Sequence, residues 1–140
     1  MRSKELELDI EDIEYPSVGI AYHNDRKIKI KNTLPGQRVL AKVAKGKGRL
    51  ITKIKPSDQE ITPLCPVFDT CGGCTYQNIS YVHELEIKKK VVLEHFEGID
   101  FEFLGIEGTE QTGYRNKMEY SFGDKEKDGE LHLGLRKRNS

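Results

Sequence analysis

The stretch "RKIKIKNTLPGQRVLAKVAKGKGRLITKIK", residues 26–55, decides the fold of this 140-residue chain. Apolar residues alternate with basic ones along three segments of it, and the turn sequences "LPGQ" and "KGKG" separate these segments. A period of two predicts strands with one buried and one exposed face. The pattern also occurs before this stretch: Leu6, Leu8 and Ile10 alternate with acidic residues, and Val18 and Ile20 follow the turn "YPS".

The chain therefore begins with five short predicted strands, spaced about ten residues apart and joined by tight turns. We expect a five-stranded OB-like barrel, because closure of a sheet removes its unprotected edges. Three prolines in "KPSDQEITPLCP", residues 55–66, mark a linker after it. The predicted fold class is mainly β with an α+β second part. Its predicted divisions are a barrel at 1–57, a linker and cysteine-rich loop at 58–80, and the start of an α+β domain at 81–140.

The charges of the chain are segregated, although its formal net charge is +0. Residues 1–25 carry seven acids, whereas residues 26–55 carry eleven bases and no acid. The basic strands could pair with the acidic first strand across the sheet. Since seven acids do not neutralise eleven bases, a net positive face of the kind that binds polyanions is favoured. Its candidate phosphate contacts are Lys27, Lys29, Arg38, Lys42, Lys47, Arg49 and Lys53.

Aromatic residues are scarce in the predicted barrel, where only Tyr15 and Tyr22 occur. Because stacking on bases needs aromatic side chains, this scarcity favours binding to a nucleic-acid backbone over base readout.

All three cysteines lie in "CPVFDTCGGCTYQ", residues 65–77, as Cys65, Cys71 and Cys74. In a chain that begins without a secretory signal sequence, such clustering favours thiolates bound to zinc or to an iron–sulfur cluster. The two glycines would let the backbone approach an inorganic sulfide. A fourth ligand is needed, and His83 is a nearer candidate than His95. Three ordinary buried thiols are the alternative, which the crowding of the cysteines into ten positions disfavours.

Ser80 is predicted to cap a helix that runs from about Tyr81 to Glu97, with Gly98 as its stop signal. After it, "GYRNKMEYSFG" and the alternating leucines at 131, 133 and 135 predict a β-hairpin with one apolar face. Only one helix is available to cover that face. We therefore expect residues 61–140 to be the start of a larger domain and the chain to be a fragment.

Taken together, "CPVFDTCGGCTYQ", the helical "KKKVVLEHF" and "GYRNKMEYSFG" resemble the RNA (uracil-5-)-methyltransferase family, particularly its 23S ribosomal RNA branch. The barrel is similar to the TRAM domain that these enzymes carry at their N-terminus. The resemblance covers nearly all of the chain. It is specific for the Cys-Gly-Gly-Cys-x-x-Gln element joined to Gly-Tyr-Arg-Asn-Lys, and weak for the barrel alone.

The resemblance implies that Cys65, Cys71 and Cys74 are three of the four ligands of a [4Fe–4S] cluster, and that the fourth lies past Ser140. It also implies that Arg115 and Lys117 extend the basic track within a central RNA-contacting domain. The family transfers a methyl group from S-adenosylmethionine to carbon 5 of uracil, with a nucleophilic cysteine and a carboxylate. Those residues and a Gly-x-Gly-x-Gly turn are missing from this sequence. We assign no catalytic residue and expect the chain alone to be inactive.

Two other functions compete with this interpretation. One is a non-enzymatic, zinc-dependent RNA-binding module with Cys65, Cys71, Cys74 and His83 as ligands. The other is a small electron-transfer protein, which is disfavoured because an electron carrier needs no basic barrel. The sequence has no run of 18 apolar residues that would span a membrane. We expect a monomeric cytoplasmic protein that has ribosomal RNA as its partner and takes part in rRNA processing.

Overall fold

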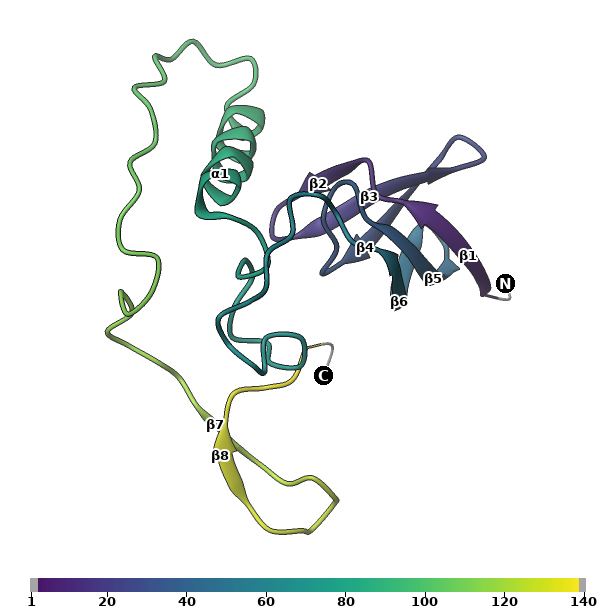
Figure 1. Ribbon diagram of the computed structural model, residues 1–140, viewed down its shortest axis with the longest axis vertical. Helices are drawn as coiled ribbons and strands as arrows, with labels where there is room; N and C mark the ends of the chain where they lie inside the picture. Colours follow the sequence, from purple (N-terminus) through teal and green to yellow (C-terminus); the bar gives the residue numbers. More distant parts are fainter. Residues whose placement is uncertain (1–2, 139–140) are drawn as a thin grey trace.

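The computed structural model describes residues 3–138 (Figure 1). Its first part is a single curled sheet of six strands, in the order β1-β5-β6-β4-β3-β2. The strands are β1 (Lys4–Asp9), β2 (Asp12–Glu14), β3 (Val18–His23), β4 (Arg26–Lys31), β5 (Arg38–Ala44) and β6 (Lys47–Lys55). Neighbouring strands are antiparallel, except that β4 and β6 run parallel. The predicted mainly β, barrel-like character of the first part of the chain is confirmed.

The sheet has six strands rather than the predicted five because the first strand breaks at Ile10 and Glu11. β1 pairs with β5, whereas β2 pairs with β3. The hydrogen bonding continues across the break, since the N–H of Ile10 donates to Gln37 O and that of Glu11 to Ile20 O, each at 2.8 Å. The two end strands of the sheet order are thus consecutive in the chain, and the sheet curls to bring them together (Figure 1).

The core of the curled sheet consists of the inward residues of the alternating pattern. Its buried residues come from the apolar positions of β1, β3, β4 and β5 and from the break after β1: Leu8, Ile10, Ala21, Ile28, Ile30, Val39 and Ala41. The turn between β4 and β5 closes one side, where Thr33 Oγ1 donates to Ile30 O at 2.8 Å and the N–H of Leu34 to Gln37 Oε1 at 2.9 Å. The alternation of residues 26–44 therefore predicted the core correctly.

Helix α1 (Tyr81–His95) packs beside the sheet and agrees with its prediction to within two residues. Ser80 Oγ caps it by accepting from the N–H of His83 at 3.4 Å, and Gly98, with φ of 82°, follows its end. Ile87 joins a small cluster with Ile13, Leu34 and Ile79. Lys90 also pairs with the carboxylate of Asp12. The helix is thereby attached to the second strand of the sheet.

After α1, the chain up to residue 138 is irregular apart from a short hairpin of β7 (Ser121–Gly123) and β8 (His132–Gly134). A hairpin forms at the predicted place, with Phe122 opposite Leu133, but its strands are shorter than predicted and leave out Met118 and Tyr120. Figure 1 shows that the segment from α1 to β7 and the hairpin itself stand away from the curled sheet. Of the helices in residues 3–138, none is long and apolar enough to cross a membrane.

Candidate nucleic-acid interface and cysteine-rich loop

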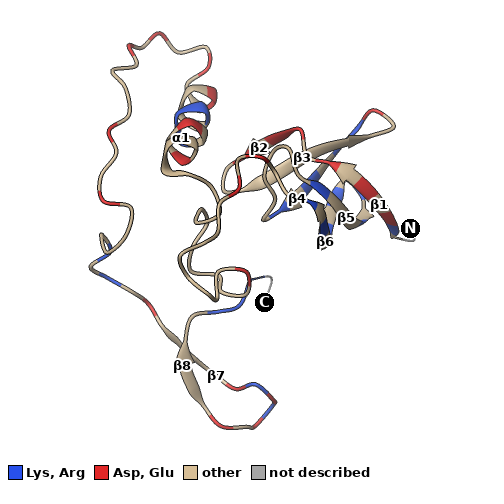
Figure 2. Cartoon of the chain, in the orientation of Figure 1, with Lys and Arg blue, Asp and Glu red and all other residues tan. Residues whose placement is uncertain are grey.

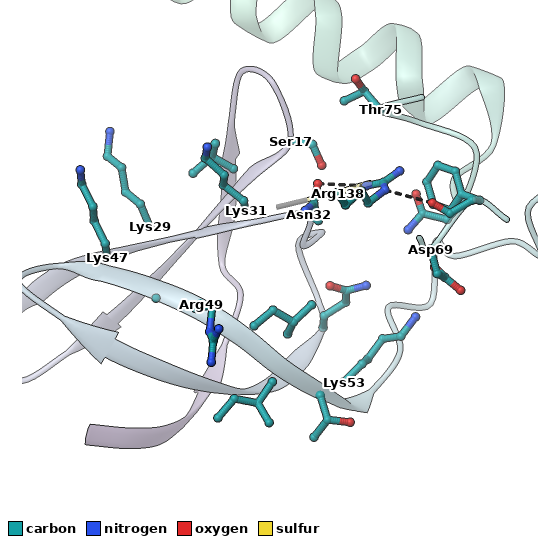
Figure 3. Close-up of a pocket in the computed structure, with 18 residues that line it drawn as sticks. Ser17, Lys29, Lys31, Asn32, Lys47, Arg49, Lys53, Asp69, Thr75 and Arg138 are labelled. Atoms are coloured by element: carbon teal, nitrogen blue, oxygen red, sulfur yellow. Dashed lines mark hydrogen bonds between the residues drawn. The ribbon is translucent and has the colours of Figure 1, made fainter. Parts of the chain in front are cut away.

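A groove of about 870 Å³ lies between the curled sheet and the cysteine-rich loop, residues 61–78 (Figure 3). One side consists of β4 and β6, and the other includes Phe68, Asp69, Thr75 and Asn78 of the loop. Among the lining residues of the described chain, Asp69 is the single acid. We call this feature the basic groove because six cations line it: Lys29, Lys31, Lys47, Arg49, Lys53 and Arg138.

The strand pattern explains why these cations gather on one side. Ile28 and Ile30 of β4 point into the core, so that Lys29 and Lys31 point outward. In β6, Leu50 packs against the core and leaves Arg49 outward. The parallel register then places Lys29 opposite Lys47. Adjacent strands are about 4.8 Å apart, so these two lysines stand side by side on the outer face of the sheet.

Acidic neighbours neutralise part of this surface. Glu14 pairs with Lys27 at 2.5 Å and with Lys29 at 2.6 Å, and these hydrogen bonds lower the pKa of the Glu14 carboxyl. The same contact with Glu14 raises the pKa of Lys27. Glu60 pairs with Lys53 at 2.5 Å. Burial alone would raise the pKa of Glu60, but hydrogen bonds from Lys53, Gln37 and the Ser57 N–H lower it.

Apart from Arg138, which donates to carbonyl oxygens, three cations of the basic groove remain without an acidic neighbour in the described chain. Lys31, Lys47 and Arg49 make no ion pair with any residue in the range 3–138. Pairing with Glu14 and Glu60 therefore accounts for part of the positive charge of the groove and leaves these three cations uncompensated. Figure 2 shows the same division, with acids on β1 and β2 and bases on β4 and β6.

The structure gathers four of the nine predicted RNA-contacting residues in the basic groove, namely Lys29, Lys47, Arg49 and Lys53. Lys27 lies on β4 outside its lining. Arg38 and Lys42 lie on β5 and face acids of β1: Arg38 Nη2 is 3.6 Å from Glu7 Oε2, and Lys42 is opposite Glu5. These three residues are outside the groove but on the same sheet.

Arg115 and Lys117 are not brought to the basic groove. Both are exposed and belong to the extended segment before β7, where Lys117 Nζ lies 3.0 Å from Glu119 Oε1. Figure 1 shows this segment on the far side of the molecule from β4 and β6. A role for them would require a ligand that reaches beyond the groove.

Two lining cations were not among the predicted contacts. Lys31 continues the alternation of Lys27 and Lys29, so the pattern itself could have included it. Arg138 reaches the groove from the far end of the sequence, and no local pattern indicates this position.

The cysteine-rich loop is closed at its base and supported along one edge. Glu60 and Ile79 form a β-bridge, and the N–H of Ile61 donates to Asn78 O at 3.0 Å. Further along, the N–H of Gly72 donates to Arg136 O at 2.8 Å, and that of Arg138 to Thr70 O at 2.9 Å. The loop is thus paired with a segment that follows the hairpin.

The two glycines of "CGGC" permit this pairing. A Cβ at Gly72 would lie 2.9 Å from Arg136 O, and one at Gly73 would lie 2.8 Å from Leu135 Cδ1. The first contact is with backbone and leaves no room for a side chain, whereas the second is with the end of a leucine side chain, which would have to move. The structure thus gives these glycines a role in the protein's own packing, whereas the sequence interpretation assigned them to an inorganic sulfide.

The three cysteines are free thiols, and N–H donors face two of their sulfur atoms. Gln77 Nε2 donates to Cys74 Sγ at 3.1 Å, while Gln77 Oε1 accepts from the N–H of Cys65 at 3.2 Å. The N–H of Gly73 points at Cys71 Sγ at 3.4 Å. Thiol donors supported by N–H groups suit the chemistry of a thiolate-bound metal or cluster.

Geometry does not complete such a site within residues 3–138, because no three His, Cys, Asp or Glu side chains lie close enough to hold a metal ion. His83 Nδ1 is 2.9 Å from Ser80 Oγ at the start of α1, and His95 Nδ1 is 2.7 Å from Val91 O. Both candidate histidine ligands thus use one ring nitrogen within the helix. The donor chemistry fits a metal, and the arrangement in this chain does not by itself enclose one.

No protein-family model matches the chain. It is 47% identical, over its whole length, to an uncharacterized RNA methyltransferase of Clostridium acetobutylicum, and 46% identical over 96% of its length to one of Clostridium tetani. It is also 30% identical over its whole length to the 23S rRNA (uracil(1939)-C(5))-methyltransferase RlmD of Vibrio parahaemolyticus. The chain spans about a third of the length of these relatives. Along its length the chain is thus homologous to part of proteins named RNA methyltransferases, among them a 23S rRNA (uracil-C5)-methyltransferase.

Proposed function

We propose that this chain is the RNA-binding and iron–sulfur portion of a 23S rRNA (uracil-C5)-methyltransferase that uses S-adenosylmethionine. The observation that carries the proposal is the basic groove, which is the feature a phosphate backbone requires, in a chain homologous to an enzyme named for ribosomal RNA. In this assignment the chain contributes substrate binding. Methyl transfer would depend on the parts of the relatives that this chain does not span.

The chemistry of the groove supports RNA binding through the backbone. Lys31, Lys47 and Arg49 lack acidic partners within residues 3–138, so a phosphate would meet charges that are not already paired. The aromatic residues predicted for the barrel, Tyr15 and Tyr22, do not line the groove, and Phe68, which does, is only 5% exposed. Such a surface positions a strand without reading its bases. Base selection would then depend on the remainder of the enzyme.

Binding to single-stranded RNA tests this assignment. A labelled oligouridine of about 12 nucleotides would be titrated into the chain over a series of salt concentrations. Replacement of Lys47 and Arg49 by Gln removes two groove charges. The slope of log affinity against log salt is negative, and its magnitude should decrease by about 1.4. The matched control replaces Lys125 and Lys127, in the turn of the hairpin, and should leave the slope unchanged. Equal effects of the two pairs would contradict a binding site in the groove.

We also propose that Cys65, Cys71 and Cys74 supply three ligands of a [4Fe–4S] cluster, with the fourth ligand outside this chain. The spacing of the three cysteines within ten positions of the sequence, and the N–H donors toward Cys71 and Cys74, support this proposal. When bound, such a cluster would act as a structural staple for the loop. We expect no part for it in methyl transfer.

Metal and acid-labile sulfide analysis after anaerobic purification tests the cluster. It should be performed on this chain and on a longer chain that covers the full length of the relatives. Four irons and sulfide in the longer chain, with none in the shorter one, would support the proposal. One zinc in the short chain would instead favour the zinc-dependent RNA-binding module, with His83 or a neighbour as the remaining ligand.

A further inference from the structure

All three nitrogens of the Arg138 guanidinium donate hydrogen bonds, and together they reach four acceptors. Nε donates to Phe68 O at 3.0 Å and to Cys71 O at 2.9 Å, and Nη2 donates to Cys74 O at 2.6 Å. On the other side, Nη1 donates to Asn32 Oδ1 at 2.9 Å. The planar arginine fork offers five donors in a fixed arrangement, and this site uses that geometry.

These acceptors belong to two separate parts of the molecule. Three are backbone carbonyls of the cysteine-rich loop, and the fourth belongs to Asn32, directly after β4 of the curled sheet (Figure 3). Asn32 is itself held, since its N–H donates to Ser17 O at 2.9 Å. The Arg138 side chain therefore bridges a fixed point of the sheet to the cysteine-rich loop.

Phe68 shows how far the loop depends on this contact. It is 5% exposed and is the one fully buried residue between Ile61 and Asn78. The Arg138 guanidinium carbon lies 4.3 Å from the centre of its ring, a cation–π contact. Phe68 also lines the basic groove. The same arginine thus covers the buried centre of the loop and fixes the position of the loop along the basic groove.

We infer that Arg138 is a positioning residue, which holds the cysteine-rich loop against Asn32 as the second wall of the basic groove. It couples the order of the loop to the affinity of the groove for RNA, and this second part rests on the proposed function. Because each of its three nitrogens already donates to a carbonyl group of the protein, we infer that Arg138 acts through the loop and not as one more phosphate contact. A lysine, which carries the charge but not the fork, should fail to replace it.

Hydrogen exchange and RNA affinity together test the inference on the full chain. Amides of residues 65–78 should exchange about tenfold faster in Arg138→Lys and in Arg138→Gln, because hydrogen bonds to a charged group are lost. Amides of β3, β4 and β5 should keep their rates and so show that the sheet is intact. Affinity for the oligouridine should fall by a similar factor in both variants. Arg136→Gln is the matched control, since it removes one exposed charge two residues away.

Asn32→Gly tests the other end of the bridge without a change of charge. Asn32 has a φ of 60°, which glycine adopts freely, so the turn is preserved while the acceptor is removed. The loop amides should again exchange faster. If Arg138→Lys keeps both loop protection and RNA affinity, Arg138 contributes only charge and the inference is overturned. If wild-type protein binds no RNA yet the loop amides respond as expected, the proposed function fails and the positioning role of Arg138 stands.

Discussion

Ile30 in β4 and Phe122 in β7 occupy similar places in the sequence pattern, each an apolar residue in an alternating strand. Ile30 is nevertheless fully buried, whereas Phe122 is 74% exposed. The first belongs to a curled six-stranded sheet that encloses its own core, and the second to a hairpin with three residues in each strand. Two strands alone do not bury a face. Alternation therefore indicates where a strand lies, and burial depends on how many strands surround it.

The largest expected difference in stability between these two regions comes from truncating one apolar side chain in each. Ile30→Ala removes a fully buried side chain from the centre of the core and should lower the free energy of unfolding by about 3 kcal/mol. Phe122→Ala removes an exposed ring and should change it by less than about 0.5 kcal/mol. Urea unfolding followed by circular dichroism measures both. A loss of similar size for Phe122→Ala would show that the hairpin is buried in solution, and the contrast would break down.

A second comparison adds one methyl group instead of removing several. A Cβ at Gly19 would lie 2.0 Å from Thr33 Oγ1 and 2.8 Å from Ile10 Cγ2, so Gly19→Ala forces buried groups apart. We expect a loss of about 2 kcal/mol. Gly123 in the hairpin has no atom within 4 Å of such a Cβ, and Gly123→Ala should be close to neutral. Thermal unfolding of the two variants checks the difference, and a neutral Gly19→Ala would contradict the close packing of β3 against the turn at Thr33.

The smallest expected effect concerns the acids that hold the sheet and its neighbours together. Asp12, Glu14 and Glu60 have a lowered pKa in the folded chain, so each contributes stability above its unfolded pKa. This stability is lost as the pH falls below about 4.5 and through the folded pKa values. For these partly exposed pairs we expect about 1 kcal/mol or less in total. Unfolding in urea at about pH 6 and about pH 3 measures the loss.

Glu60→Gln serves as the control for the acid effect, because it removes one of the titrating groups and keeps the shape of the side chain. The variant should be less stable near neutral pH and should lose less stability on acidification. An unchanged pH dependence would show that the Lys53–Glu60 pair makes no contribution. The same variant also frees Lys53 in the basic groove from its acidic partner, so it can be added to the RNA-binding measurements described above.

Much of this architecture follows from local sequence. Alternation and turn residues predicted the strands of residues 26–55, and Ser80 and Gly98 predicted both ends of α1. The break of the first strand was missed, although a signal was present. The buried positions change phase there, from Leu8 and Ile10 to Ile13, so that one strand cannot present all three to the same side. This phase change is the mark of the break.

The site was less accessible to sequence reasoning because its parts come from distant positions. The partners of Arg138 lie 64 to 106 residues away, at Cys74, Cys71, Phe68 and Asn32. No periodicity links residues so far apart. The alternation did identify Lys29, Lys47, Arg49 and Lys53, but the division between paired and unpaired cations required the positions of Glu14 and Glu60. The cluster ligands and the domain boundaries stay predictions.

The broken first strand has a consequence for synthesis on the ribosome. β1 pairs with β5, and β5 pairs with β6, so the first strand emerges well before its partner exists. At about 5–20 residues per second, the delay between Asp9 and Ala44 amounts to a few seconds. During this interval β3 and β4 can form their hairpin, with β2 beside it, while β1 waits unpaired. A pause in translation between β4 and β5 would lengthen this exposed period, and the codons for residues 32–37 are where it would act.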